Sequence, residues 1–312
     1  MKIAVIGTGI ISQSHLSAIS HYKNFTLCAV CDINEDAAKA YGEKYDVPYF
    51  TDYREIPVKT DAEAVILNLP HWLHCQVTEF FLHQGLHVLV EKPMANTAEE
   101  CSRMLEAAKC CGKKLAVGHV QRFLQANRKV KEYCQSGELG KLCMITEYRT
   151  IDYFKPQRPK WFLDKKLAGG GIVMNYGAHA LDKMYYVMDS RPAVIQASVG
   201  NMKNDCTIEG HAQIHIQFQN SVSANITFSG YNNAGYETVY YFTDGALKVV
   251  DGSILYVRTD KTWDPVALEE RESFLLQLDA FYNLVNDLPS ESPTGEYGKD
   301  VITAIEQIYG KG

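Results

Sequence analysis

The sequence has no long apolar run, no strong excess of one charge and no regular cysteine framework. No segment of the 312 residues approaches the roughly 18 consecutive apolar residues of a membrane-spanning helix. A formal net charge of −6 argues against non-specific binding to nucleic acid, so we expect neither nucleic-acid nor membrane partners. An apolar run begins at Lys2, and we therefore expect no signal peptide and a cytoplasmic protein.

The cysteines argue against a disulfide framework and a redox pair. There are nine of them, an odd number without framework spacing, so we expect reduced thiols. Cys28 and Cys31 form a C-x-x-C pair, but they fall in a predicted buried strand, whereas redox pairs sit at helix N-termini. His71 and His74 are spaced H-x-x-H, which alone is weak evidence for a metal, and we expect no metal site.

The most informative stretch is the first 32 residues. An apolar run at residues 2–6 leads into Gly7-Thr8-Gly9-Ile10-Ile11, a helical pattern follows, and a second apolar run at 25–31 ends in Asp32. In a strand–turn–helix unit, Gly7 permits the tight turn and Gly9 lets the backbone approach a pyrophosphate. The following helix directs its N–H groups at the phosphates. We predict that Gly7, Thr8, Gly9, Ile10 and Ile11 bind a dinucleotide, with Ser12 replacing the usual third glycine.

Asp32 predicts the choice of cofactor. A carboxylate at the tip of the second strand accepts hydrogen bonds from the adenosine ribose and repels a 2′-phosphate. Ile33 and Asn34 follow, so no arginine is at hand for that phosphate. We predict a preference for NAD(H) over NADP(H).

Strands and helices are predicted to alternate to about residue 120. Further apolar runs at 64–67, 86–90 and 114–117 end next to Pro70, Lys92 and His119. This alternation predicts a doubly wound parallel sheet that binds its ligand at the carboxyl ends of the strands. We expect a Rossmann domain at 1–120, with Pro70, His74, Glu91 and Lys92 near the cofactor. Lys92 could also stabilise a developing alkoxide, and Glu91 could orient it.

The pattern changes after residue 120. A helix is predicted over 122–136, a strand over 142–149 and a basic, aromatic loop over 152–164. Apolar residues occupy every second position of 211–218 and 222–228, which predicts an antiparallel sheet with one covered face. Helices are predicted near 269–286 and 298–308. We therefore expect a second, α+β domain at 121–312.

A helix is also predicted from the three glycines at 169–171 to about Met188. Asn175 and His179 are spaced i, i+4 on it, so they share a face, and we place the buried stripe elsewhere. His179 suits a general acid/base that takes a hydroxyl proton, with Asn175 beside it. The glycines are expected to let the backbone approach a ligand. Arg122, Lys160 and Trp161 are weaker candidates for contacts to substrate.

Together these residues resemble the glucose–fructose oxidoreductase / inositol dehydrogenase / rhizopine catabolism family, Gfo/Idh/MocA. The resemblance rests on Gly7-Thr8-Gly9, Asp32, Glu91-Lys92-Pro93-Met94-Ala95, Gly169-Gly170-Gly171 and the stretch from Asn175 to Asp182. It implies a C-terminal domain with a large open, mainly antiparallel sheet. It also implies an oxidoreductase that transfers a hydride between NAD(P) and a sugar, polyol or related hydroxy compound.

The resemblance places Lys92 and His179 in the catalytic site and implies homodimers or homotetramers joined through the open sheet. The family commonly has Asp where this chain has Asn175, and an amide cannot stabilise an imidazolium by charge. His179 is then a weaker base, or Lys92 carries more of the proton transfer.

Two alternatives stay open on the sequence. One is a glycoside-cleaving enzyme that oxidises its sugar transiently with bound NAD. The other is a non-catalytic NAD-sensing regulator on the same fold, which the presence of both Lys92 and His179 disfavours.

Overall fold

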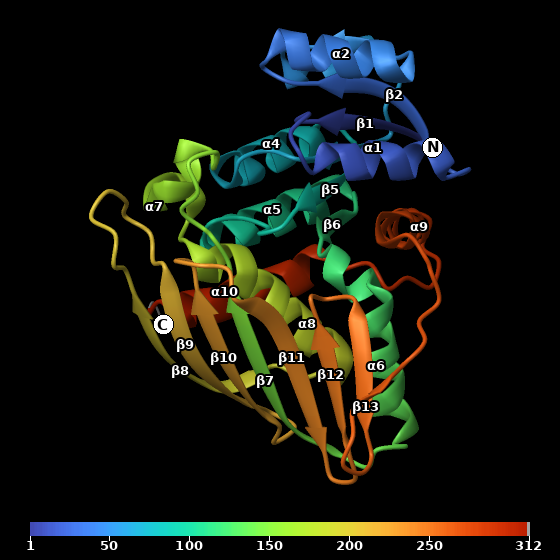
Figure 1. Ribbon diagram of the computed structural model, residues 1–312. Coiled ribbons are helices and arrows are strands. Elements are labelled where there is room, and N and C mark those ends of the chain that lie inside the picture. Colours follow the sequence, from blue (N-terminus) through green and yellow to red (C-terminus); the bar gives the residue numbers. More distant parts are fainter. Residues whose placement is uncertain (311–312) are drawn as a thin grey trace. The chain divides into compact units, whose positions relative to one another are not determined.

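The computed structural model describes residues 1–310, and the chain divides into two compact units (Figure 1). The first unit comprises residues 1–119 and 274–302, and the second comprises residues 120–273 and the chain from Thr303 on. The sequence predicted a single division near residue 120. The structure differs because the chain returns to the first unit before it ends.

The first unit is built on a parallel sheet. Its six strands lie in the order β3-β2-β1-β4-β5-β6. The strands are β1 (Lys2–Ile6), β2 (Thr26–Cys31), β3 (Tyr49–Phe50), β4 (Ala64–Leu67), β5 (His87–Glu91) and β6 (Leu115–Gly118). All five neighbouring pairs are parallel, which confirms the predicted doubly wound sheet.

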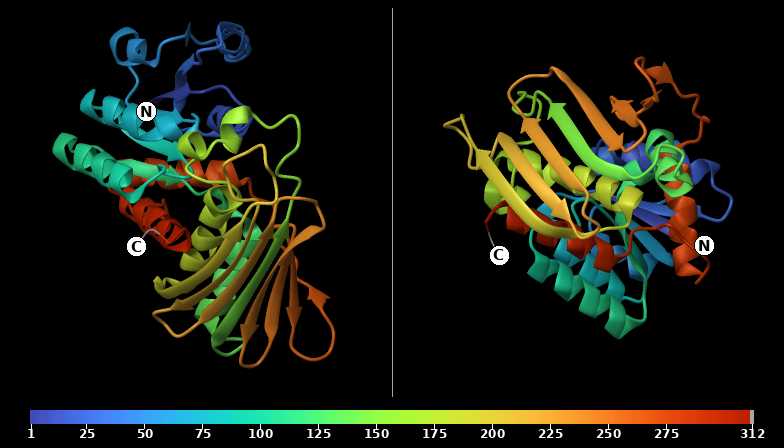
Figure 2. Two further views of the ribbon diagram at one scale, coloured as in Figure 1. Left: turned by 90° about the vertical axis from the view of Figure 1, so that its left-hand side faces the viewer. Right: turned by 90° about the horizontal axis from the view of Figure 1, so that it is seen from below.

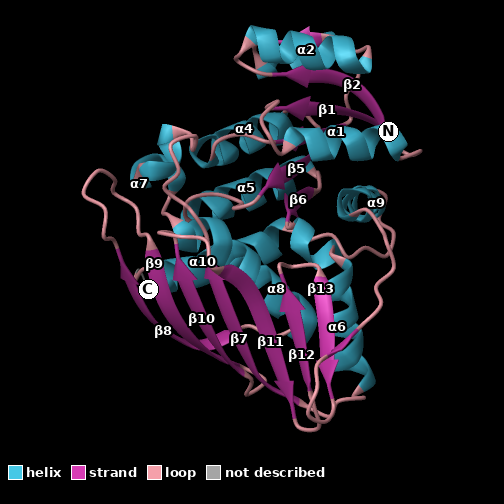
Figure 3. Ribbon diagram, in the orientation of Figure 1, coloured by secondary structure: helices cyan, strands magenta, loops and turns pink. Residues whose placement is uncertain are grey.

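Helices connect these strands (Figure 3). They are α1 (Ser12–His21), α2 (Glu35–Tyr45), η1 (Tyr53–Glu55), α3 (Ile56–Lys59), α4 (His71–His83) and α5 (Ala98–Cys111). Asn34 caps α2 by accepting the N–H of Ala37, and Thr97 caps α5 by accepting that of Glu100. Both caps follow the side-chain preference of helix N-termini.

The returning segment explains the division of the chain. Helix α9 (Ser273–Val285) contributes Leu278 and Phe281 to the core that also contains Ile3 and Val5. Helix α10 (Gly295–Ile308) follows, and a bridge joins Thr294 to Ala116 of β6. Burial of apolar side chains against β1 therefore assigns residues 274–302 to the first unit.

The second unit contains an eight-stranded sheet in the order β14-β13-β12-β11-β7-β10-β9-β8 (Figure 2). The strands are β7 (Leu142–Thr150), β8 (Pro192–Gly200), β9 (His211–Phe218), β10 (Ser223–Ser229), β11 (Gly235–Phe242), β12 (Ala246–Val250), β13 (Ile254–Arg258) and β14 (Asp264–Pro265). Only β7 and β10 pair in parallel, so the sheet is mixed but mainly antiparallel. This confirms the predicted class.

Helices of the second unit cover one face of this sheet (Figure 2). The helical segments of this unit are η2 (Val120–Phe123), α6 (Gln125–Ser136), η3 (Lys160–Leu163), α7 (Lys165–Ala168), the π-helix η4 (Val173–Gly177) and α8 (Ala178–Met188). Leu124 interrupts the helix predicted over 122–136, and the helix predicted from the glycines begins as a π turn. Alternation along β9 leaves Gln213 and His215 exposed on the other face.

Candidate functional site

The glycine turn of the first unit is shaped for a dinucleotide. Gly7 has φ +89, and a Cβ on it would lie 2.4 Å from the main-chain oxygen of Asn68, so only glycine fits. Gly9 faces open space, with nothing within 4 Å of a built Cβ. The main-chain N–H groups of Ile10 and Ile11 bond no acceptor within residues 1–310. Together with the start of α1, these donors fit a pyrophosphate.

Asp32 is fixed by the same turn. Its Oδ2 accepts the N–H of Thr8 at 2.7 Å and the Thr8 hydroxyl at 3.0 Å, and its Oδ1 accepts the N–H of Asn34 at 2.9 Å. Thr8 is buried, so it holds Asp32 and does not present a free N–H to a phosphate. The neighbouring Ile33 side chain is 93% exposed, and the Asp32 carboxylate is partly exposed beside it. This arrangement suits a ribose diol.

The Glu91-Lys92-Pro93 turn is held by a buried histidine that the sequence analysis missed. His15 of α1 is 0% exposed, and its Nε2 lies 2.8 Å from Oε1 of Glu91. Oε2 of Glu91 accepts the N–H of Lys92 at 3.1 Å. Burial opposes the charge on Glu91, but His15 and Lys92 outweigh it and hold the pKa of this carboxyl below its usual value. Glu91 therefore orients the turn.

A second buried histidine fastens the other side of the turn. His74 of α4 is 0% exposed; Nδ1 lies 2.8 Å from the Pro93 oxygen and Nε2 lies 2.8 Å from the Leu69 oxygen. Burial lowers the pKa of His74. Both nitrogens are engaged by the main chain, so His74 positions two loops. This differs from the cofactor contact predicted for it. Pro70 directly precedes α4 as its N-cap residue and is partly buried.

The three glycines of the second unit have a structural explanation. A Cβ on Gly170 would lie 2.0 Å from the Tyr309 hydroxyl, and one on Gly171 would lie 2.1 Å from the main-chain oxygen of Glu209. Gly169 ends α7 with φ +77. Side chains and backbone of the same unit fill the space beside Gly170 and Gly171, so packing alone accounts for these two glycines. The approach of a ligand to the glycines stays a prediction.

Glu209 and Tyr309 fix the start of the π turn. The Glu209 carboxylate is buried and accepts the N–H of Gly171 at 2.9 Å and that of Val173 at 2.8 Å. It also accepts the Tyr309 hydroxyl at 2.8 Å. A carboxylate at a helix N-terminus is favoured by the helix dipole. The sequence gives no local signal for this contact, since Glu209 and Tyr309 lie far from the glycines along the chain.

Asn175 and His179 straddle the junction of two helix types. Asn175 lies in the π turn and is buried, and His179 lies in α8 and is partly exposed. The π turn changes the angular relation that α-helical spacing predicts, and such turns recur at functional sites. The Tyr176 ring lies 6.4 Å from that of His179 and 6.2 Å from that of Tyr153. Burial raises the pKa of Tyr153, so its hydroxyl remains protonated.

Burial on α8 is not confined to a single stripe. Nine of the eleven residues of α8 are buried, including Lys183 and Asp182. Arg122, predicted to contact substrate, is buried and donates to Oδ1 of Asp182 from Nη2 at 2.5 Å and from Nε at 3.2 Å. This ion pair holds η2 to α8 and gives Arg122 a structural role.

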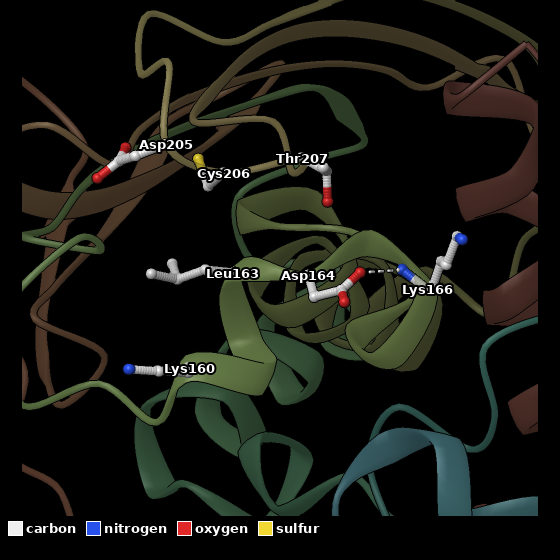
Figure 4. Close-up of a pocket in the computed structure, with 7 residues that line it drawn as sticks. All are labelled: Lys160, Leu163, Asp164, Lys166, Asp205, Cys206 and Thr207. Atoms are coloured by element: carbon white, nitrogen blue, oxygen red, sulfur yellow. Dashed lines mark hydrogen bonds between the residues drawn. The ribbon is translucent and has the colours of Figure 1, made fainter.

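Lys160 and Trp161 lie in η3. Lys160 is exposed at the edge of an open pocket of about 550 Å³ in the second unit (Figure 4). The pocket is lined by Lys160, Leu163, Asp164, Lys166, Asp205, Cys206 and Thr207. Asp164 accepts the N–H of Lys166 there and so caps α7. Trp161 stacks on Phe162, with 3.7 Å between ring centroids.

Several kinds of site have no counterpart in the part of the chain that the structure describes. Within residues 1–310, no group of three or more His, Cys, Asp or Glu side chains could hold a metal ion. No helix in that range has both the length and the apolar character to cross a membrane. The nine cysteines are free thiols, and burial raises the pKa of Cys28 to about 11.

Sequence comparisons match both parts of the chain to one family. A family described as "Oxidoreductase family, NAD-binding Rossmann fold" matches residues 1–119, and the "GFO/IDH/MocA C-terminal domain" matches residues 127–249. Among solved structures, an aldose-aldose oxidoreductase from Caulobacter crescentus in complex with glycerol has a TM-score of 0.92 at 23% identity. That alignment covers 100% of this chain and 97% of the other, and it shows a shared fold.

Two relatives are dehydrogenases by name. A 1-carboxy-3-chloro-3,4-dihydroxycyclo hexa-1,5-diene dehydrogenase of Comamonas testosteroni is 33% identical over 235 residues, covering 74% of this chain and 58% of that protein. A D-glucoside 3-dehydrogenase of Escherichia coli is 26% identical over 337 residues, covering 99% of this chain and 94% of that protein. With both family matches and the geometry of the glycine turn, the chain belongs to the Gfo/Idh/MocA family of NAD-binding oxidoreductases.

Proposed function

We propose that this protein is an NAD-dependent dehydrogenase that oxidises a secondary hydroxyl of a sugar, a polyol or a related hydroxy compound. The observation that carries the proposal is the joint match of the Rossmann unit and the C-terminal unit to one oxidoreductase family. The relatives named above are dehydrogenases acting on a dihydroxy ring and a glucoside. These names do not favour the glycoside-cleaving enzyme or the regulator.

The first unit supplies the residues for the cofactor. When bound, a nicotinamide dinucleotide supplies the two-electron acceptor. Gly7 and Gly9 allow close approach of the pyrophosphate, and the N–H groups of Ile10 and Ile11 donate to it. Asp32, held by Thr8 and Asn34, accepts hydrogen bonds from the ribose. Its carboxylate repels a 2′-phosphate, so we propose NAD(H) over NADP(H).

Lys92 is the proposed group that stabilises charge on the substrate oxygen. Glu91 fixes its main-chain N–H, and His15 and His74 fasten the turn from α1 and α4. The ammonium of Lys92 donates to the substrate hydroxyl and stabilises the alkoxide that develops there. A turn fixed by three buried side chains, those of Glu91, His15 and His74, reduces the reorganisation that this step requires.

His179 is the proposed base of the second unit. It takes the proton from the substrate hydroxyl oxygen onto an imidazole nitrogen, and the Asn175 amide hydrogen-bonds the substrate from the π turn. Because an amide carries no charge, it does not stabilise the imidazolium, and the His179 base is weaker than it would be beside a carboxylate.

The test measures NADH formation by absorbance with NAD and a panel of sugars, polyols and uronic acids. Lys92→Ala and His179→Ala should each lower kcat by at least roughly 100-fold, within the usual range for removing an acid–base group. NAD binding, followed by thermal shift, should change much less. Lys39→Ala, an exposed lysine of α2, is the matched control. A Lys92→Ala enzyme with normal kcat would contradict the proposal, and binding without turnover of any compound would favour the regulator.

The cofactor preference has its own test. The ratio of kcat/KM for NAD to that for NADP should exceed one by a wide margin. Asp32→Asn removes the charge that repels the 2′-phosphate and should bring the two values closer together. Equal kcat/KM values in the unchanged protein would refute this assignment.

Assembly and location follow as further parts of the proposal. The exposed face of the second sheet carries Tyr148, 44% exposed, and Val194, 52% exposed. We propose that this face joins copies into a homodimer or homotetramer, which sedimentation analysis tests directly. The nine free thiols favour a reducing, cytoplasmic location.

A further inference from the structure

Arg149 lies on the helix-covered face of the second sheet. It is in register with Phe228 of β10 and Tyr236 of β11. Alternation along β7 places it on the same face as Ile145 and Glu147, both of which are buried. A charged residue near the end of this central strand therefore points toward the layer that contains η4 and α8.

Two tyrosine rings hold the Arg149 side chain. Its Cζ lies 4.1 Å from the ring centroid of Tyr176 and 4.3 Å from that of Tyr236. The Tyr236 hydroxyl accepts a hydrogen bond from Nζ of Lys183 at 2.8 Å, which fixes that ring. Stacking on aromatic faces orients a guanidinium without engaging its N–H donors in hydrogen bonds. Arg149 is thus pre-organised for a planar, bidentate acceptor.

No acceptor for it exists within residues 1–310. The side chain is only partly exposed and its Nη1 is shielded from solvent, yet no described residue forms a hydrogen bond or ion pair with it. The other buried cations of this layer are paired, Lys183 with Glu147 and Arg122 with Asp182. Shielded charges in proteins are normally paired. The missing partner of Arg149 is therefore best supplied by a ligand.

Arg149 lies near His179, the proposed base, which indicates that its ligand is the substrate. The Tyr176 ring that stacks on it is also 6.4 Å from the ring of His179, so the guanidinium and this imidazole flank one tyrosine. A second guanidinium, that of Arg158, lies 3.9 Å from the ring of Tyr153, which packs on Tyr176. Arg158 donates from Nε to the main-chain oxygen of Tyr153 at 2.5 Å and has no carboxylate partner among the described residues.

We propose that Arg149 binds an anionic group of the substrate, a carboxylate or a phosphate, and that the substrate is therefore an acidic sugar or polyol. This inference rests on the proposed dehydrogenase function and narrows its substrate class. The stacked guanidinium donates two N–H groups to two oxygens of the anion. Arg158 adds positive potential from the far side of Tyr153. The hydroxyl to be oxidised is thereby presented to His179.

The experiment uses matched sets of sugars with the full chain and NAD. Each set contains a neutral sugar, its uronic acid and its 6-phosphate, in several ring configurations. Turnover is followed by NADH absorbance, and binding to the NAD-loaded protein is followed by calorimetry. In at least one set, the carboxylate or the phosphate member should bind or turn over at least tenfold better than the neutral member, and which of the two does so identifies the anion.

Three variants assign that preference to Arg149. Arg149→Gln should reduce the preference by about 10–100-fold, the range for losing a hydrogen bond to a charged group, while binding of the neutral member is unchanged. Arg149→Lys keeps the positive charge but lacks the two parallel N–H donors of the guanidinium, so it should lose part of the preference. It replaces Arg149→Gln as the test variant if that protein fails to fold. Arg258→Gln, an exposed arginine of β13, is the matched control.

The outcomes separate the two proposals. A neutral sugar used as well as its acidic counterparts would overturn the role of Arg149, and so would an acidic preference that Arg149→Gln leaves intact. Failure of every acidic member to bind would overturn it as well. If acidic members bind through Arg149 but no compound reduces NAD, the anion site stands and the dehydrogenase function fails.

Discussion

Replacing Lys183 by methionine should destabilise the protein severely. Lys183 is 1% exposed and so is Glu147, and the Lys183 Nζ lies 2.7 Å from Oε2 of Glu147. Nζ also donates to the hydroxyls of Tyr236 at 2.8 Å and Thr238 at 2.7 Å. Burial alone would lower the pKa of Lys183, but Glu147 and the nearby tyrosines outweigh it and raise this pKa. The lysine therefore stays charged.

The magnitude follows from what Lys183→Met leaves behind. Glu147 would remain buried without its cation, and breaking such a pair costs about 3–5 kcal/mol. At roughly 2–4 °C per kcal/mol for a unit of this size, the Tm should fall by about 6–20 °C. Chemical denaturation of the full chain gives the free energy of unfolding directly, because the midpoint shifts at constant slope.

Two further variants sharpen this test. The double variant Lys183→Met with Glu147→Leu removes both charges and should recover most of the loss, because apolar replacements of buried pairs are often close to neutral. Lys248→Met breaks a pair that is 3.8 Å apart and partly exposed, and it should cost less than about 1 kcal/mol. If Lys183→Met is no worse than Lys248→Met, the buried pair does not stabilise α8 against the sheet.

Two other predictions concern stability. Gly171→Ala places a Cβ 2.1 Å from the main-chain oxygen of Glu209, and this overpacking should lower the free energy of unfolding by about 1–3 kcal/mol in urea denaturation. Gly9→Ala is the control, because its Cβ meets nothing within 4 Å. Equal stability of the two variants would refute the packing argument. Burial lowers the pKa of His87 to about 4, and its Nδ1 accepts the N–H of Lys114. The unfolded chain binds this proton more readily, so stability should fall as the pH drops from about 6.5 toward 4, and less steeply in His87→Gln; identical slopes in both proteins would rule this out.

The first unit could be predicted because its signals are local. The apolar runs of β1, β4 and β5 are buried on both faces, and Gly7 and Asp32 directly follow β1 and β2. The sequence could also have indicated His15, since it adjoins the apolar Leu16 and Ile19 on the buried side of α1. A polar side chain in such a position needs a buried partner.

The second unit was harder because its signals are distant or weak. Strand β8 lies at the sheet edge with most residues exposed, so it shows no alternation. Gly170 closely approaches Tyr309, and no residue near the glycines in the sequence predicts this contact. The sequence did carry a signal for Arg149, because the alternation of β7 aligns it with Ile145 and Glu147 on one face. Charges in register with a core residue indicate a buried pair or a binding site.

The central place of β7 has a consequence for hydrogen exchange. Three strands lie on one side of β7 in the sheet and four on the other, so its amides bond neighbours on both flanks. Local opening of the sheet begins at its edge strands, β8 and β14. The β7 amides can exchange with solvent only when the whole sheet opens. Deuterium uptake should therefore be slowest on the strand that carries Arg149, and the proposed anion site would be the last part of the unit to loosen.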